Sequence, residues 1–169
     1  MSLCLIMMTG WWNFSMYTNK FIHVGEVYIG VKPTEISTIL GSCISVCLYD
    51  KIQRIGGMNH YLVPLWNENG LQSPKYGNIS IPRLIEGMLN IGCSVHNMEA
   101  KLFGGANVIE VSSEEMMIGR KNIVIAKEIL KEYKIPIIAE DIAGSKGRRI
   151  MMRSDTGKIF LKYTKKNNE

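Results

Sequence analysis

The stretch LGSCISVCLYD, residues 40–50, is followed closely by GGMNHYLVP, residues 56–64. Both are rich in β-branched, aliphatic and aromatic residues and carry glycines near their start, which is typical of strands bounded by bends. Asp50-Lys51 suits a tight connection between the two runs. The pattern therefore predicts neighbouring antiparallel strands that bring Cys43 close to His60.

Further runs of the same kind extend on both sides of this pair. Ser154-Asp155-Thr156-Gly157 separates the last two and favours a hairpin turn. We expect additional strands over residues 21–31, 35–40, 98–103, 137–142, 149–153 and 158–163.

Two segments show near-helical spacing of apolar residues. The first follows Asn78 or Ser80 as candidate N-caps and stops at Gly92, and the second covers residues 118–133 before Pro136. With the strands above, they predict an α+β fold of layered mixed or antiparallel β-sheets with two main helices.

The length of 169 residues suits one domain with its own core. We expect this domain to span residues 21–164. Residues 1–20 are rich in Met and Trp without periodicity and are interpreted as an N-terminal arm, and residues 165–169 as a basic, polar tail. Hydrophobic residues make up 46% and charged residues 21%, as in soluble globular proteins.

Charge and cysteine content narrow the function classes. The net charge of +5 comes mostly from the tail and residues 146–149, and without a nucleic-acid-binding motif we interpret it as a solvated rim. The apolar run at the start is far shorter than the roughly 20 residues that span a bilayer, and no basic residue precedes it. We therefore expect no membrane insertion. Cys4, Cys43, Cys47 and Cys93 lack paired spacing, which favours free thiols in the cytoplasm.

Cys43 is the candidate nucleophile because a thiolate attacks amide carbonyls well once its pKa is lowered by an imidazole or by backbone N–H groups. Gly41 allows a bend that would lift Cys43 out of the sheet and aim N–H groups of Gly41 and Ser42 at one point. The alternative is a buried cysteine acting as a small hydrophobe, which is the interpretation we adopt for Cys47.

His60 is the candidate base for Cys43. It follows Gly56-Gly57, which permits either close backbone approach or a bulge. Ser37 and Thr38 offer hydroxyls that could accept the imidazole N–H, and strand alternation lets only one of them face the site.

Metal binding is the competing chemistry, because Cys43, Cys47, Cys93 and His60 could supply four zinc ligands. The sequence contains no C-x-x-C pair, so we expect neither a metal site nor a cofactor. Gly104-Gly105 lacks the spacing of a phosphate-binding loop and is interpreted as a tight strand exit.

Beyond these residues, the chain resembles the CheD family of chemoreceptor glutamine deamidases. LGSCISVCLYD and GGMNHYLVP are similar to its two signature blocks and would place the family's nucleophile at Cys43 and its base at His60. Further matches are PKYGNISIPRLIEGM, AKLFGGAN, IGRKNI and AEDIAGSKGRRIM, beginning at residues 74, 100, 118 and 139.

The resemblance implies a Cys-His-Thr triad. Counting back from Cys43 without gaps puts Ser37 at the position of the threonine, with Thr38 beside it. It also implies a fold similar to the deamidase domain of cytotoxic necrotizing toxins. The backbone from Gly41 to Cys43, helped by Gly104 and Gly105, would hold the oxyanion.

The implied activity converts chemoreceptor glutamine side chains to glutamate through a thioester on Cys43, with release of ammonia. The implied partners are the cytoplasmic helices of methyl-accepting chemotaxis receptors and the CheC phosphatase. A basic rim would steer the enzyme to acidic receptor helices, with Arg120, Lys146, Arg148 and Arg149 as candidates. The alternative is a non-catalytic binding or regulatory module for CheC or the receptor.

Overall fold

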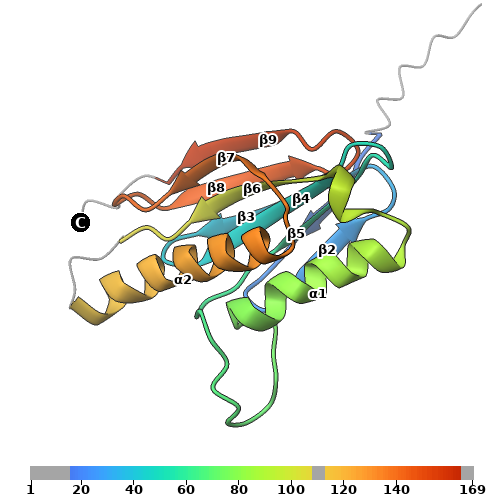
Figure 1. Ribbon diagram of the computed structural model, residues 1–169. Coiled ribbons are helices and arrows are strands. Elements are labelled where there is room, and N and C mark those ends of the chain that lie inside the picture. Colours follow the sequence, from blue (N-terminus) through green and yellow to red (C-terminus); the bar gives the residue numbers. More distant parts are fainter. Residues whose placement is uncertain (1–15, 108–112, 165–169) are drawn as a thin grey trace, which may run out of the picture.

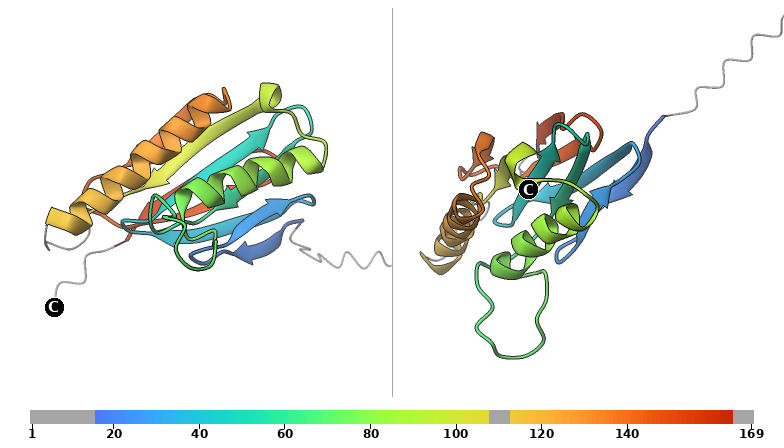
Figure 2. Two further views of the ribbon diagram at one scale, coloured as in Figure 1. Left: turned by 60° about the horizontal axis from the view of Figure 1, so that its bottom comes forward. Right: turned by 45° about the vertical axis from the view of Figure 1, so that its right-hand side comes forward.

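The computed structural model describes residues 16–107 and 113–164, and the first 15 residues, residues 108–112 and the tail 165–169 lie outside the described part. Two sheets pack against each other, and both helices lie on the outer face of the larger sheet, as Figures 1 and 2 show. The predicted α+β architecture of layered sheets with two main helices is therefore confirmed.

The larger sheet has five strands in the order β2-β5-β4-β6-β7. β4 is antiparallel to β5, as the Asp50-Lys51 connection predicts, and β6 is parallel to β7. The strands are β2 (Val27–Gly30), β4 (Ile44–Asp50), β5 (Ile55–Asn59), β6 (Met98–Gly104) and β7 (Ile137–Ile142).

The smaller sheet has four strands in the order β1-β3-β8-β9, with β1 parallel to β3 and the other pairs antiparallel. The predicted hairpin between β8 and β9 is confirmed. Residues 21–31 do not form the single strand that we expected, because the chain turns at Gly25 (φ 83°) and crosses from one sheet to the other. The strands are β1 (Thr18–Phe21), β3 (Thr34–Leu40), β8 (Arg148–Arg153) and β9 (Ile159–Tyr163).

The helices are α1 (Gly77–Asn90) and α2 (Ser113–Glu132), and a short 3₁₀ turn covers Val95–Asn97. α1 begins after Tyr76 without a side-chain cap, so the N-caps expected at Asn78 and Ser80 were wrong. Past its end, Gly92 adopts the left-handed conformation (φ 94°) of a helix stop. Within the described ranges, neither helix combines the length and the apolar composition needed to cross a membrane.

Alternation along β4 separates two cores. Ile44, Val46 and Leu48 pack toward the helices, whereas Cys47 packs toward the smaller sheet. Gly57 lies opposite Leu48 in an unbroken register, and a Cβ there would come within 2.8 Å of the Leu84 side chain of α1. Of the two roles expected for the paired glycines, the structure shows close approach and no bulge.

Candidate active site

Cys43 and His60 lie on one face of the larger sheet. Cys43 directly precedes β4, and the bridge between Ile44 and Tyr61 continues the antiparallel register of β4 with β5. This register places His60 diagonally across from Cys43 on the same face, and no hydrogen bond joins the Cys43 sulfur to Nε2 of His60 in the described structure. The shared face is the one that packs toward the smaller sheet.

A hydrogen-bond chain sets the tautomer of His60. The Thr38 hydroxyl donates to the carbonyl of Ile22 at 2.8 Å, so it can only accept from Nδ1 of His60, also at 2.8 Å. Nδ1 therefore carries the proton and Nε2 a lone pair. Nε2 is buried and has no hydrogen-bond partner among the described residues, which leaves it available as a base.

The structure brings Thr38, and not Ser37, to His60. Thr38 is fully buried and points into the space between the sheets, whereas Ser37 alternates to the opposite face of β3. The gap-free count that favoured Ser37 therefore does not match the geometry.

Burial keeps both members of the pair neutral. Desolvation lowers the pKa of His60 to about 4, reinforced by nearby His23 and only partly opposed by the Ile22 carbonyl. Desolvation also raises the pKa of the Cys43 thiol, although the backbone N–H of Cys43 itself lowers it in part. The lowered thiol pKa expected from the sequence is thus not found in the resting protein. Cys47 is fully buried, and its pKa is raised to about 12 by desolvation, in keeping with a core residue.

The backbone around Cys43 is held by Gly104 and Gly105, whose φ values are 111° and 68°. A Cβ on Gly104 would overlap the carbonyl oxygen of Cys43, so only glycine fits there. The N–H of Gly105 donates to that carbonyl at 2.8 Å, which removes it from the donors expected to bind an oxyanion.

The chain bends at Gly41 and Ser42, as expected, just before Cys43. Within the described part of the chain, the N–H groups of Ser42 and Cys43 donate to no backbone carbonyl. These two groups are the free donors closest to the sulfur in the sequence, and they suit a developing negative charge.

Asn122 of α2 also contacts this site, and the sequence analysis missed it. Its side chain is fully buried, and Nδ2 donates to the carbonyls of Ser42 (3.3 Å) and Leu62 (2.8 Å). The available signal was a polar residue within the apolar stripe that includes Ala126 and Leu130.

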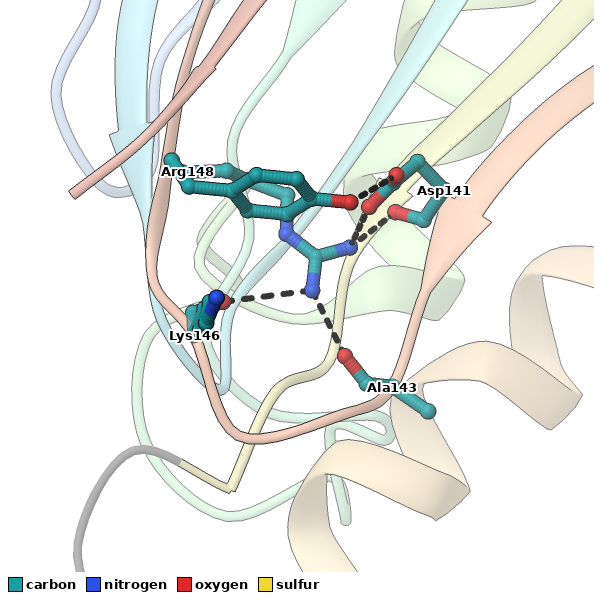
Figure 3. A network of polar contacts seen from close by, with 5 residues as sticks. Asp141, Ala143, Lys146 and Arg148 are labelled. Atoms are coloured by element: carbon teal, nitrogen blue, oxygen red, sulfur yellow. Dashed lines mark hydrogen bonds and ion pairs between the residues drawn. The ribbon is translucent and has the colours of Figure 1, made fainter.

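Arg148 does not contribute to a basic rim, contrary to expectation. Only 2% of the residue is exposed, and its guanidinium donates to the backbone carbonyls of Asp141, Ala143 and Lys146 and to the Asp141 carboxylate (Figure 3). It thereby orders the loop whose Ala143 N–H donates to the carbonyl of Gly104 at 2.9 Å. Arg120, Lys146 and Arg149 are exposed, the last on the outer face of the smaller sheet.

The four side chains considered for zinc do not converge. Cys93 packs in the helix-side core, whereas Cys43 and Cys47 belong to the core between the sheets. No group of three His, Cys, Asp or Glu side chains within residues 16–107 and 113–164 is arranged to hold a metal ion.

Comparison with known proteins identifies the family. The family model described as "CheD chemotactic sensory transduction" matches residues 64–163, more than half of the chain. A Sulfurimonas denitrificans protein named "Probable chemoreceptor glutamine deamidase CheD" is 50% identical over 151 residues, covering 89% of this chain and 97% of the relative. The chain belongs to the CheD family.

A second CheD relative, from Trichlorobacter lovleyi and of the same name, is 43% identical over 149 residues, covering 88% of this chain and 92% of its own. Matches of this length necessarily include Cys43 and His60, which precede the stretch matched by the CheD family model.

Two solved structures are more distantly similar to this CheD-family chain. Bacillus licheniformis YfiH aligns with a TM-score of 0.46 and 11% identity, over 71% of this chain and 50% of that one. A Neisseria meningitidis protein of family DUF152 aligns with a TM-score of 0.39 and 10% identity, over 76% of this chain and 62% of that one.

Proposed function

We propose that this chain hydrolyses the side-chain carboxamide of chemoreceptor glutamines to a carboxylate and releases ammonia, with Cys43 as nucleophile and His60 as base. The observation that carries the proposal is the Thr38–His60 hydrogen bond, which puts the proton on Nδ1 and leaves Nε2 of His60, on the face that Cys43 shares, without a partner among the described residues. The names of the two relatives supply the substrate class.

The reaction begins from the neutral thiol and the neutral imidazole. Nε2 of His60 takes the thiol proton as the Cys43 sulfur attacks the carboxamide carbon. The N–H groups of Ser42 and Cys43 stabilise the oxyanion, and such a donor contributes on the order of 3 kcal/mol. Thr38 accepts the Nδ1–H of the imidazolium and holds the ring in place.

The second half of the cycle restores the enzyme. His60 returns its proton to the leaving nitrogen, ammonia departs, and a thioester remains on Cys43. His60 then takes a proton from water, the resulting hydroxide attacks the thioester, and glutamate leaves as the sulfur regains its proton. One water is consumed and one ammonia released per glutamine, so the balance requires no redox partner and no cofactor.

We further propose that the substrate glutamines lie on receptor helices in the cytoplasm, where the chain would also encounter the CheC phosphatase as a second partner. The exposed side chains of Arg120 and Lys146 would attract the acidic surface of such helices. The steering would weaken at high salt, because exposed charges are screened over about 10 Å at 0.1 M ionic strength.

The test is Cys43→Ala, with Cys47→Ala as the matched control on the same face of the larger sheet. Both variants are incubated with a purified chemoreceptor cytoplasmic domain, and ammonia release and the mass gain of the receptor are measured. We expect no deamidation with Cys43→Ala and near-normal deamidation with Cys47→Ala. Deamidation by Cys43→Ala would refute the proposal.

The same assay distinguishes an enzyme from a non-catalytic binding or regulatory module for CheC or the receptor. If the unmodified protein binds the receptor domain and releases no ammonia from it, the chain acts as a binding or regulatory module, and the enzymatic proposal fails.

A further inference from the structure

We propose that Asn122 is a positioning residue, which fixes the orientation of the Ser42–Cys43 peptide and so aims the Cys43 N–H at the substrate oxyanion. The inference rests on the proposed function, because it assigns a residue to that same reaction. The side chain of Asn122 is fully buried, and its Nδ2 donates to the carbonyl of Ser42.

The geometry of the peptide group gives the contact its effect. In a trans peptide the carbonyl of one residue and the N–H of the next point in opposite directions. Because Asn122 holds the Ser42 carbonyl toward α2, the Cys43 N–H points away from the helix layer. That is the side on which the Cys43 sulfur and His60 lie. The Cys43 N–H partly lowers the pKa of the Cys43 thiol, which agrees with an N–H that points toward the sulfur.

Asn122 also ties the nucleophile to the base. The second hydrogen of Nδ2 goes to the carbonyl of Leu62, two residues after His60, at 2.8 Å. The hydroxyl of Tyr61 donates in turn to the backbone carbonyl of Asn122. One side chain therefore links the bend before Cys43 with the segment after His60.

The chemistry of these contacts requires an amide nitrogen. Both partners are carbonyl oxygens, so they need a donor, and a carboxylate of the same shape would repel them. The remaining atom, Oδ1, is buried without a hydrogen-bond partner within the described residues. An acceptor buried without a partner is unfavourable, so we expect a side chain that is kept there to do more than fill space.

The test compares Asn122→Asp with the unmodified protein and with Ser154→Ala as a stability control. The Ser154 hydroxyl is equally buried, accepts from the Thr34 N–H and donates to the Lys32 carbonyl, at the opposite end of the sheets from Cys43. Each protein is assayed for deamidation of a receptor cytoplasmic domain, with kcat and KM determined separately, and for unfolding by urea.

We expect Asn122→Asp to lower kcat at pH 7.5 by about 100-fold, as for a misdirected oxyanion donor, and to change KM little. Part of the loss should be recovered as the pH falls, because the introduced carboxyl regains a donor when it is protonated. Ser154→Ala should lose stability without losing kcat. With a structural role alone, kcat would recover only in parallel with the stability that urea unfolding measures at each pH.

Four results are distinguishable. An unchanged kcat in Asn122→Asp would overturn the inference. It would also be overturned if Ser154→Ala lost as much kcat as Asn122→Asp when the two variants lose the same stability. A loss of kcat that is the same at every pH would also overturn it. Absence of deamidation by the unmodified protein would instead refute the proposed function.

Discussion

The buried hydroxyl of Thr38 decides which nitrogen of His60 carries the proton. It donates to the Ile22 carbonyl and can therefore only accept from Nδ1, which leaves the lone pair on Nε2. The same burial makes a resting thiolate–imidazolium pair unfavourable, since it lowers the pKa of His60 and raises that of Cys43. Proton transfer is thus expected to accompany the attack on the substrate.

The role of Thr38 is tested by Thr38→Val, which keeps the shape and removes the hydroxyl. We expect a ten- to hundredfold loss of kcat, since a hydrogen bond to a charged group is worth roughly 1.5–3 kcal/mol. Thr38→Ser should retain most of the activity. Ser37→Ala is the matched control on the same strand, and a loss there as large as in Thr38→Val would contradict the assignment.

Sequence reasoning proposed Cys43 and His60 because glycines, strand character and a short connection predicted neighbouring strands, and because the resemblance to the CheD family put its nucleophile and base there; the structure places both on one face of the larger sheet. It narrowed the third residue to Ser37 or Thr38 and could not choose, since the phase of β3 depends on which face packs against the larger sheet. It missed Asn122 because a polar residue on a helix acquires meaning only when its partners, two backbone carbonyls distant in sequence, are known.

Among the elements, α2 approaches the site through two facing glycines. A Cβ on Gly119 would lie 2.9 Å from the carbonyl oxygen of Gly105, and a Cβ on Gly105 would lie 2.8 Å from the Ile123 side chain. This close approach sets α2 at the depth at which Asn122, one turn after Gly119, reaches Ser42 and Leu62.

We predict that Gly119→Ala lowers the deamidation rate at least tenfold. The new Cβ would press against the backbone oxygen of Gly105, and α2 would have to shift away from it and take Asn122 along. Gly87→Ala in α1 is the control. Its Cβ would meet only the flexible end of the Ile29 side chain, and alanine favours a helix by about 1 kcal/mol over glycine. Rates and urea unfolding of both variants are measured, and a normal rate in Gly119→Ala would contradict this account of the helix.

Element types were predictable and some of their boundaries were not. The strands of the central pair and the last hairpin follow from local alternation and turn residues. The start of α1 does not, because the side chains expected to cap it are used elsewhere. Asn78 accepts from the Trp66 N–H, and Ser80 accepts from Asn59.

At the scale of the molecule, the two stacked sheets shield the base from most of the solvent. Only 5% of His60 is exposed, and the smaller sheet covers it through β3. Because burial between the sheets lowers the pKa of His60, it also makes the free energy of unfolding depend on pH.

We predict that the free energy of unfolding decreases as the pH falls from 6.5 to 4. The unfolded chain, with a histidine pKa near 6.5, binds a proton that His60 in the fold, with a pKa of about 4, does not. The contribution is present in full above pH 6.5 and amounts to roughly 3 kcal/mol. Urea unfolding between pH 4 and 7.5 measures it. The decrease should be smaller by that amount in His60→Gln, and equal slopes in the two proteins would show that His60 is not held neutral.

In the proposed reaction the Cys43 sulfur, assisted by His60, attacks the substrate carbon. The most direct measurement uses a receptor-derived peptide in which a chloromethyl ketone replaces the glutamine carboxamide, followed by mass spectrometry of the digested protein. We predict one adduct, on Cys43, formed far more slowly in His60→Gln. An adduct on Cys47 or Cys93 in place of Cys43, or labelling of Cys43 at the same rate with and without the imidazole, would contradict it.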